Sequence, residues 1–174
     1  MKDRRRDRSR TRRRVALARA LEQVEAEGLD SLETQGLDLL FLDEEDLRSG
    51  FAEALEAVGL FEAVMAWAGH LEEDGGLWRR RLALVGREPR LRARRAELDE
   101  AWRGLLGAHF LRWGAAGPQG ERLARLEAEL ALAALRGAER LWLDGNGRPV
   151  MPVLAQEALA TLWPALYGHV RKAR

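Results

Sequence analysis

The sequence contains no cysteine, and this absence removes several classes of protein from consideration. A disulfide scaffold, a thiol nucleophile and a thiolate zinc site all require cysteine. Serine is nearly as scarce, and none of the three serines lies in a turn that would present a nucleophile. The histidines, His70, His109 and His169, lie far apart without the spacing of metal ligands. We therefore expect no enzymatic activity, no metal site and no cofactor.

Long apolar runs are also missing. No stretch approaches the roughly eighteen apolar residues that a transmembrane helix needs, and the basic N-terminus lacks the apolar segment of a signal peptide. We therefore expect a cytoplasmic protein that does not enter a membrane. At 174 residues the chain can bury a single core, with room for a small appendage.

Proline is rare, with five residues, and no segment alternates polar and apolar residues as a half-buried strand does. The chain is instead 47% apolar and 33% charged, and it is rich in alanine, leucine, glutamate and arginine. These four residues are good helix formers. The sequence predicts an all-α fold.

The net charge of +1 conceals a strong segregation along the chain. Residues 1–14 carry nine basic and two acidic side chains, whereas residues 15–78 carry two basic and sixteen acidic ones. Residues 79–174 are basic again, with eighteen basic and ten acidic side chains. Such asymmetry concerns the partners of a protein more than its fold.

Helical periodicity divides the chain into a series of predicted helices. We expect the basic arm to be disordered to about Ser9, because it is almost purely charged. A first helix is predicted from Thr11 to Glu27, with Gly28 ending it. Asp43 is placed as the N-cap of the next helix, which stops near residue 59. The later predicted helices span residues 60–73, 77–86, 89–113, 121–144 and 152–169, the last with a kink at Pro164.

The last two predicted helices are apolar on more than one side, which is wider than the single stripe of a surface helix. They are either core helices of a compact monomer, or helices that pack inward on one side and meet a second copy on the other. We favour the second interpretation, an isologous four-helix interface. The predicted interface residues are Leu130, Ala134, Leu135, Trp142, Leu159, Leu162, Trp163 and Leu166.

Three segments of the C-terminal part are similar in sequence pattern to a known protein family. They are "REPRLRARRAELDEAWRGLLGAHFLRWG", the alanine- and leucine-rich helix that ends in "RLWLDGNG", and "EALATLWPALYG". This part resembles the body of TetR/AcrR-type bacterial transcription regulators. The resemblance implies a TetR-like helical bundle, dimerisation through the C-terminal helices, and an apolar effector cavity in the middle helices.

The N-terminal part resembles the same family less completely. In the family a helix-turn-helix leads to a junction of Leu-Tyr-x-His-Phe, then Pro, a small polar cap, Lys, and Leu three residues later. The stretch "LDLLFLDEEDL", residues 37–47, falls into that register. Asp38 takes the place of the tyrosine and Glu44 that of the lysine, two side chains that usually contact DNA phosphates in the family. Both positions have become carboxylates.

The spacing of this region is too short for a complete helix-turn-helix. Between Gly28 and Asp43 fourteen residues remain, and the junction takes six of them. Eight are left, whereas two short helices and a turn need about 18 residues in total. Residues 29–47, the acidic segment, also carry seven carboxylates and no basic group, which repels phosphate. We therefore predict a basic arm over 1–14, a remnant of a helix-turn-helix module over 15–47, and a ligand-binding and dimerisation domain over 48–174.

Two sets of residues are candidates for binding. Aromatic and histidine side chains of the middle helices suit a small hydrophobic ligand, although ordinary core or surface tryptophan is the alternative. They are Trp67, His70, Trp78, Trp102, His109, Phe110 and Trp113. The arginines of the arm suit nucleic acid or another anion, with a solubilising tail as the alternative. They are Arg4, Arg5, Arg6, Arg8, Arg10, Arg12, Arg13 and Arg14.

Three functions remain open at this point. The first is a homodimeric, TetR-like regulator of repressor type that senses a small hydrophobic effector and whose DNA contact is weak or lost. The second is a working repressor with an atypical N-terminal module. The third is a ligand-binding or partner-sequestering dimer without a nucleic-acid role.

Overall fold

The computed structural model describes residues 2–32, 36–114 and 116–167, with side chains from residue 11 onward except at 163 and 165–167. These residues are helical and contain no strand, which confirms the predicted all-α class. The α-helices are α1 (Lys2–Glu27), α2 (Gly36–Leu39), α3 (Glu44–Ala57), α4 (Leu60–Glu73), α5 (Gly75–Arg87), α6 (Pro89–Trp113), α7 (Pro118–Asp144) and α8 (Met151–Tyr167). A 3₁₀ turn at Leu29–Ser31 follows α1.

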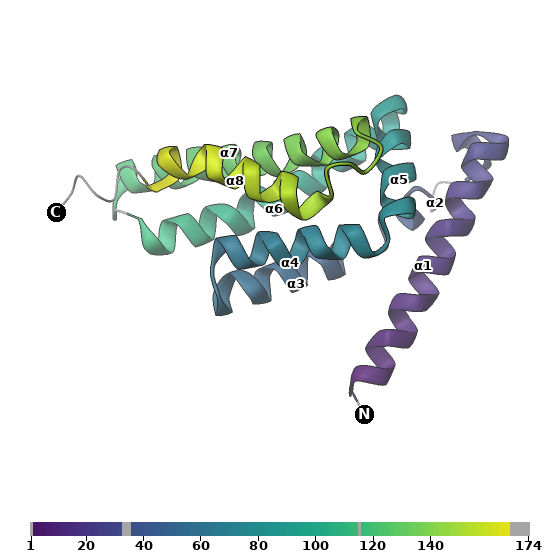
Figure 1. Ribbon diagram of the computed structural model, residues 1–174, viewed down its shortest axis with the longest axis horizontal. Helices are drawn as coiled ribbons and strands as arrows, with labels where there is room; N and C mark the ends of the chain where they lie inside the picture. The colour runs from purple at the N-terminus through teal and green to yellow at the C-terminus, as the bar shows by residue number, and fades with distance from the viewer. Residues whose placement is uncertain (1, 33–35, 115, 168–174) are drawn as a thin grey trace.

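The long helices form the body of the molecule. Helices α6, α7 and α8 lie alongside one another, and α3 and α4 form a second layer against them (Figure 1). Trp67, Trp102 and Trp142 are each at most 2% exposed within the core that these helices share. Large aromatic side chains of this kind supply much of the buried apolar area of a small domain.

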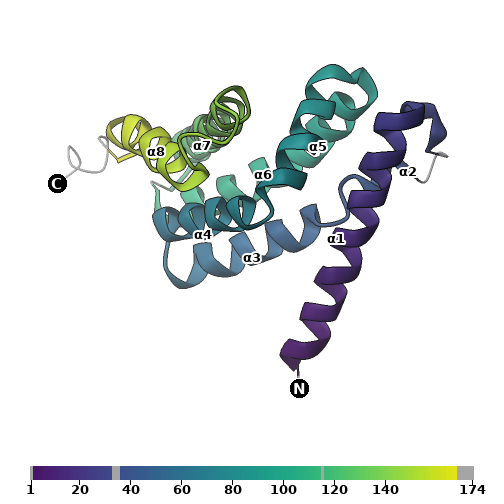
Figure 2. The same ribbon diagram turned by 45° about the vertical axis from the view of Figure 1, so that its right-hand side comes forward.

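A second, smaller core joins α1 to the body. Helix α1 crosses one end of the body next to α5, and its N-terminal half projects away from the other helices (Figure 2). The apolar face of its second half packs on the segment that follows it, on the end of α5 and on the start of α6. The buried residues of this core are Leu17, Ala20, Leu21, Val24, Leu29, Leu32, Leu40, Phe41, Leu84, Val85 and Leu91.

The basic arm differs from the sequence prediction. Disorder was expected to about Ser9, but α1 begins at Lys2 and continues without a break to Glu27. Arginine is a good helix former, and adding a residue to an existing helix is much easier than starting one. The packed second half of α1 therefore provides the nucleus from which the helix continues into the arm.

The described residues between α1 and α3 form only short helical turns. Gly28 ends α1 with a φ of +87°, a conformation that glycine adopts without strain. A 3₁₀ turn and the four-residue α2 follow, so the described residues contain no complete helix-turn-helix. Asp43 does precede α3 as predicted, but its side chain does not cap the helix. Its carboxylate accepts a hydrogen bond from Arg81 of α5 instead.

The C-terminal helices differ slightly from their predicted bounds. Helix α7 begins three residues early, because Pro118 fits the first turn of a helix, where no backbone N–H is needed. Helix α8 begins at Met151, and Pro164 lies within it as predicted. The predicted end near His169 lies outside the described residues.

Candidate ligand site and the paired acidic segment

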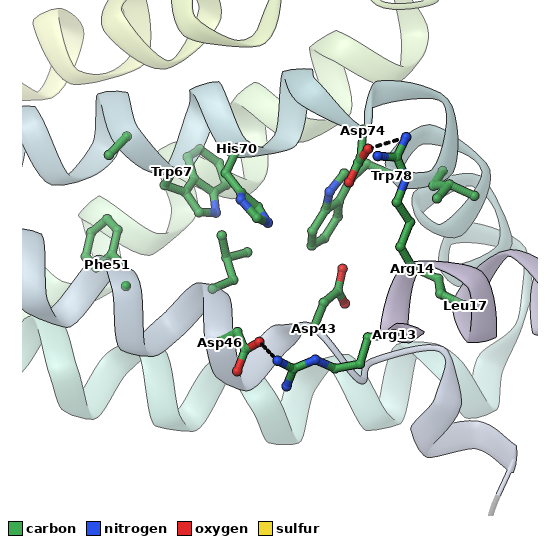
Figure 3. Close-up of a pocket in the computed structure, with 14 residues that line it drawn as sticks. Arg13, Arg14, Leu17, Asp43, Asp46, Phe51, Trp67, His70, Asp74 and Trp78 are labelled. Atoms are coloured by element: carbon green, nitrogen blue, oxygen red, sulfur yellow. Dashed lines mark ion pairs between the residues drawn. The ribbon is translucent and has the colours of Figure 1, made fainter. Parts of the chain in front are cut away.

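A pocket of about 230 Å³ lies between α1 and the body (Figure 3). It is bounded by the second half of α1, the first half of α3, the end of α4 and the start of α5. Each of these elements contributes side chains, so the pocket exists only while α1 is packed on the body. We call it the α1 pocket.

Part of the wall of the α1 pocket is aromatic. Phe51, Trp67, His70 and Trp78 line it, and the ring centroids of His70 and Trp78 lie 6.2 Å apart, edge to face. The guanidinium of Arg81 lies 3.7 Å from the ring centroid of Trp78, a cation–π contact that holds this ring in place. An aromatic cavity with a few polar groups is typical of sites for small apolar molecules.

The mouth of the α1 pocket carries two ion pairs between α1 and the body. Arg13 pairs with Asp46 of α3, and Arg14 lies 2.6 Å from Asp74 at the start of α5 (Figure 3). We call these two pairs the arginine latch. Both arginines belong to the predicted nucleic-acid-binding set, so the latch uses charges that would otherwise be available to phosphate.

Several described carboxylates of the acidic segment pair with arginines of the body. Near its start and centre, the carboxylates of Asp30 and Asp38 lie 2.8 Å and 3.0 Å from Arg90 and Arg94 of α6. At its end, Asp43 and Glu44 lie 2.7 Å and 3.3 Å from Arg81. The predicted N-cap, Asp43, makes no side-chain cap, whereas Asp46 of the acidic segment pairs with Arg13 of the basic arm.

Glu44 belongs to a buried charge network that joins α3, α5, α6 and α7. Besides pairing with Arg81, its carboxylate accepts a hydrogen bond from Trp102 Nε1 at 3.0 Å. Burial by itself raises the pKa of Glu44, but the charges of Arg95, Arg81 and Arg136 and the Trp102 hydrogen bond outweigh it, and the pKa falls to about 2. Glu44 is therefore ionised at neutral pH.

The other half of this network lies between α6 and α7. Arg95 donates to both carboxylate oxygens of Glu139 at 2.9 Å, and Arg136 bridges Asp99 and Glu139. Burial alone would lower the pKa of Arg95, but Glu139, Glu44 and Asp99 raise it. Sequence reasoning missed this network. The i,i+4 and i,i+3 spacings of Arg95 with Asp99 and of Arg136 with Glu139 were visible, but such pairs are usually solvated.

The structure divides the predicted ligand-binding residues. Trp67, His70 and Trp78 line the α1 pocket together. Trp102 does not line the pocket. Its ring is in edge-to-face contact with Phe51, and its Nε1–H donates a hydrogen bond to Glu44. The remaining three lie near the far end of α6, where His109 contacts Phe110 and Trp113 is 73% exposed. These three do not contribute to the α1 pocket.

The predicted dimer residues need correction. Leu135, Trp142 and Leu159 are at most 2% exposed because they pack inside the protomer, so they cannot meet a partner at its surface. Leu130, Ala134 and Leu162 are half-buried, and the side chains of Trp163 and Leu166 lie outside the described residues. Among the described side chains of α7 and α8, the exposed apolar ones include Leu126, Ala133, Leu141, Val153 and Ala160.

The predicted nucleic-acid-binding arginines lie in α1. Arg12 is exposed, whereas Arg13 and Arg14 form the arginine latch. The side chains of the others, Arg4, Arg5, Arg6, Arg8 and Arg10, lie outside the described residues. No set of histidine, aspartate and glutamate side chains within the described ranges could hold a metal ion, and no helix there could span a membrane.

The protein is an all-helical bundle with an N-terminal basic helix and an aromatic pocket. A family model of TetR-type C-terminal domains matches residues 52–166, and the chain therefore belongs to the TetR family of transcription regulators. Within that family the matching model is described as the MftR C-terminal domain. The match begins inside α3 and leaves α1, α2 and the acidic segment outside it. No curated protein and no solved structure matches the chain at a significant level.

Proposed function

We propose that the protein is a homodimeric regulator of repressor type that senses a small hydrophobic effector and whose contact with DNA is weak or lost. One observation is the main support for weak or lost contact with DNA. The two positions at which the resembled family contacts phosphate hold Asp38 and Glu44, and these carboxylates pair with Arg94 and Arg81 of the body. A segment held against the body by its own charges leaves no cation there for a DNA backbone.

The second support for reduced DNA contact is that the described residues between α1 and α3 contain no helix long enough to read a groove. The four residues of α2 form barely one turn, about 6 Å at ~1.5 Å per residue, and a recognition helix must present several side chains along a major groove. The arm of α1 remains as a source of positive charge. Contact through arginines alone depends on phosphate rather than on base edges, so it would be sequence-independent and sensitive to salt.

The effector is assigned to the α1 pocket. Three of the residues that the sequence pointed to, Trp67, His70 and Trp78, meet there. The pocket lies against α1, so an occupant touches the element that carries the arm. The dimer is assigned to the exposed apolar side chains of α7 and α8, because a contiguous apolar surface is the usual mark of an interface.

The arginine latch favours a second candidate, a ligand-binding dimer without a nucleic-acid role. Arg13 and Arg14 are already paired with Asp46 and Asp74, so part of the basic charge of α1 serves to attach it to the body. Gel-shift binding of the full chain to an arbitrary duplex, between about 50 and 200 mM salt, separates the candidates.

Our proposal expects binding at the lower salt concentration that disappears at the higher one and does not depend on DNA sequence. Sequence-selective binding that survives the higher salt would instead indicate a working repressor with an atypical module. Absence of binding even at the lower salt would favour the second candidate.

A further inference from the structure

Trp67 has an unsatisfied polar group at the wall of the α1 pocket. The residue is 2% exposed, and its indole Nε1–H has no hydrogen-bond partner among the described residues. Figure 3 shows this nitrogen on the side of the Trp67 ring nearest to His70. An indole N–H can only donate, and a buried donor without a partner is unfavourable. A ligand that brings an acceptor to this point removes that cost.

The aromatic walls favour a flat occupant. Trp67 and Trp78 stand on different helices, and in Figure 3 the His70 ring lies between them, with open space between His70 and Trp78. Arg81 covers Trp78 with its guanidinium, and Phe51 is held by Trp102 in edge-to-face contact. A ring inserted between fixed aromatic walls gains stacking contact without reorganising them. A volume of about 230 Å³ suits a molecule of one or two rings.

The charges at the α1 pocket disfavour a charged occupant. The lining carboxylates Asp43, Asp46 and Asp74 pair with Arg81, Arg13 and Arg14 respectively. An anion that paired with one of these arginines would separate it from its carboxylate. A cation that paired with one of these carboxylates would separate it from its arginine. Either exchange leaves one side-chain charge without its partner, which counts against binding.

We infer that the α1 pocket binds a flat, uncharged aromatic molecule with one hydrogen-bond acceptor, which receives the Nε1–H of Trp67. This inference rests on the proposed function, because it names the chemical class of the proposed effector. The acceptor can be a carbonyl, ether or hydroxyl oxygen, since the structure specifies the donor and the shape around it.

Four probes of one ring system test the inference by calorimetric titration of the full chain. They are naphthalene, acetylnaphthalene, naphthoate and naphthylmethylammonium, which add to the same ring no polar group, a neutral acceptor, an anion or a cation. We expect acetylnaphthalene to bind roughly five- to tenfold more tightly than naphthalene, the gain of one neutral hydrogen bond. The two ions should bind more weakly than acetylnaphthalene.

Trp67→Phe provides the matched variant, because it keeps an aromatic ring and removes the donor. We expect it to bind naphthalene and acetylnaphthalene equally, whereas Trp113→Phe, at an exposed position away from the pocket, keeps the wild-type preference. The indole N–H resonances give a second readout in wild-type protein, so the test does not depend on the variant folding. The Trp67 resonance should move with acetylnaphthalene and much less with naphthalene, while that of Trp142, which does not line the pocket, stays in place.

The outcomes separate the ligand class from the proposed function. Tightest binding by either ion, or a preference for acetylnaphthalene that survives Trp67→Phe, would overturn the inference and leave a ligand-binding pocket. Failure of all four probes to bind would overturn both the inference and the assignment of the effector to this pocket.

Discussion

Glu44, at a position where the resemblance leads one to expect a phosphate contact, lies in the protein interior. The residue is 3% exposed and is held by Arg81 and Trp102. A buried carboxylate is stable only when its partners replace the water it loses. The carboxylate of Glu44 therefore attaches the start of α3 to α5 and α6.

The depressed pKa of Glu44 predicts a specific dependence of stability on pH. The folded state holds this pKa near 2, below the ordinary 4.5, so ionised Glu44 favours folding. The contribution is complete above pH 4.5 and is lost as the pH falls from 4.5 towards 2. Urea unfolding should show a loss of about 2 kcal/mol from this group by about pH 3, at ~1.4 kcal/mol per pH unit.

The variant Glu44→Gln should lack this part of the acid loss, with lower stability at neutral pH. Its neighbour Glu45 provides the control, because it is exposed and its ion pair is with Arg48 on the same helix. Glu45→Gln should follow the wild-type pH profile. A profile of Glu44→Gln as steep as that of the wild type would contradict the role assigned to Glu44.

Arg81 and Arg90 both pair with carboxylates, but they should contribute very differently to the free energy of unfolding. Arg81 is fully buried, pairs with Asp43 and Glu44, and donates to a backbone carbonyl. Arg90 pairs with Asp30 at an exposed site. Urea unfolding should show a loss of about 3–5 kcal/mol for Arg81→Gln, because it leaves a carboxylate buried without its partner. The loss for Arg90→Gln should stay below about 1 kcal/mol, and equal losses would refute the distinction.

At the scale of the element, α1 combines two regions with different support. Its second half buries Leu17 and Leu21 in the smaller core, whereas its first half projects from the body (Figure 1). A helical stretch without tertiary packing is marginal in water when it is shorter than about 12 residues. Hydrogen–deuterium exchange should therefore be fast over residues 2–9 and slow over 17–27.

The variant Leu21→Ala extends this prediction. Leu21 is completely buried, so the change should cost about 2–5 kcal/mol and accelerate exchange over residues 17–27. Exchange in the middle of α7, which packs in the other core, should change much less. Val15→Ala, at a position 47% exposed, is the matched control. Uniform acceleration throughout the chain would show that the two cores unfold as one unit.

At the scale of the whole molecule, the exposed apolar side chains of α7 and α8 predict the assembly state. Leu126 and Leu141 are 56% and 59% exposed and lie on one side of α7. In an isologous interface each substitution acts twice, because the same surface occurs on both subunits. Leu126→Glu and Leu141→Glu should each convert a dimer into a 19.6 kDa monomer, as measured by light scattering.

Val58→Glu is the control for this prediction. Val58 is 59% exposed, as Leu141 is, but it follows α3 rather than lying on α7 or α8. It should leave the dimer intact. A wild-type chain that scatters as a monomer at high concentration, or a dimer that survives both glutamate substitutions, would rule out the proposed interface.

Much of the fold was predictable because the signals are local. Gly28, Pro89 and the apolar periodicity of α4 mark helix boundaries through backbone preferences that act within one or two turns. The shortness of the region between α1 and α3 was predictable from its residue count alone. Of the residues that line the α1 pocket, Trp67, His70 and Trp78 were candidates from sequence because they are aromatic or histidine side chains of the middle helices.

What the sequence determined by itself is therefore the helical class, most helix bounds from α3 to α6 and the separation of charge along the chain, since each depends on neighbouring residues. Tertiary structure alone decided which of two apolar sides of α7 faces inward, burying Leu135 and leaving Leu126 exposed. It also decided that Glu44 meets Arg81 and that α1 closes a pocket with Trp67. These outcomes depend on contacts between residues far apart in the chain, and local preferences do not specify such contacts.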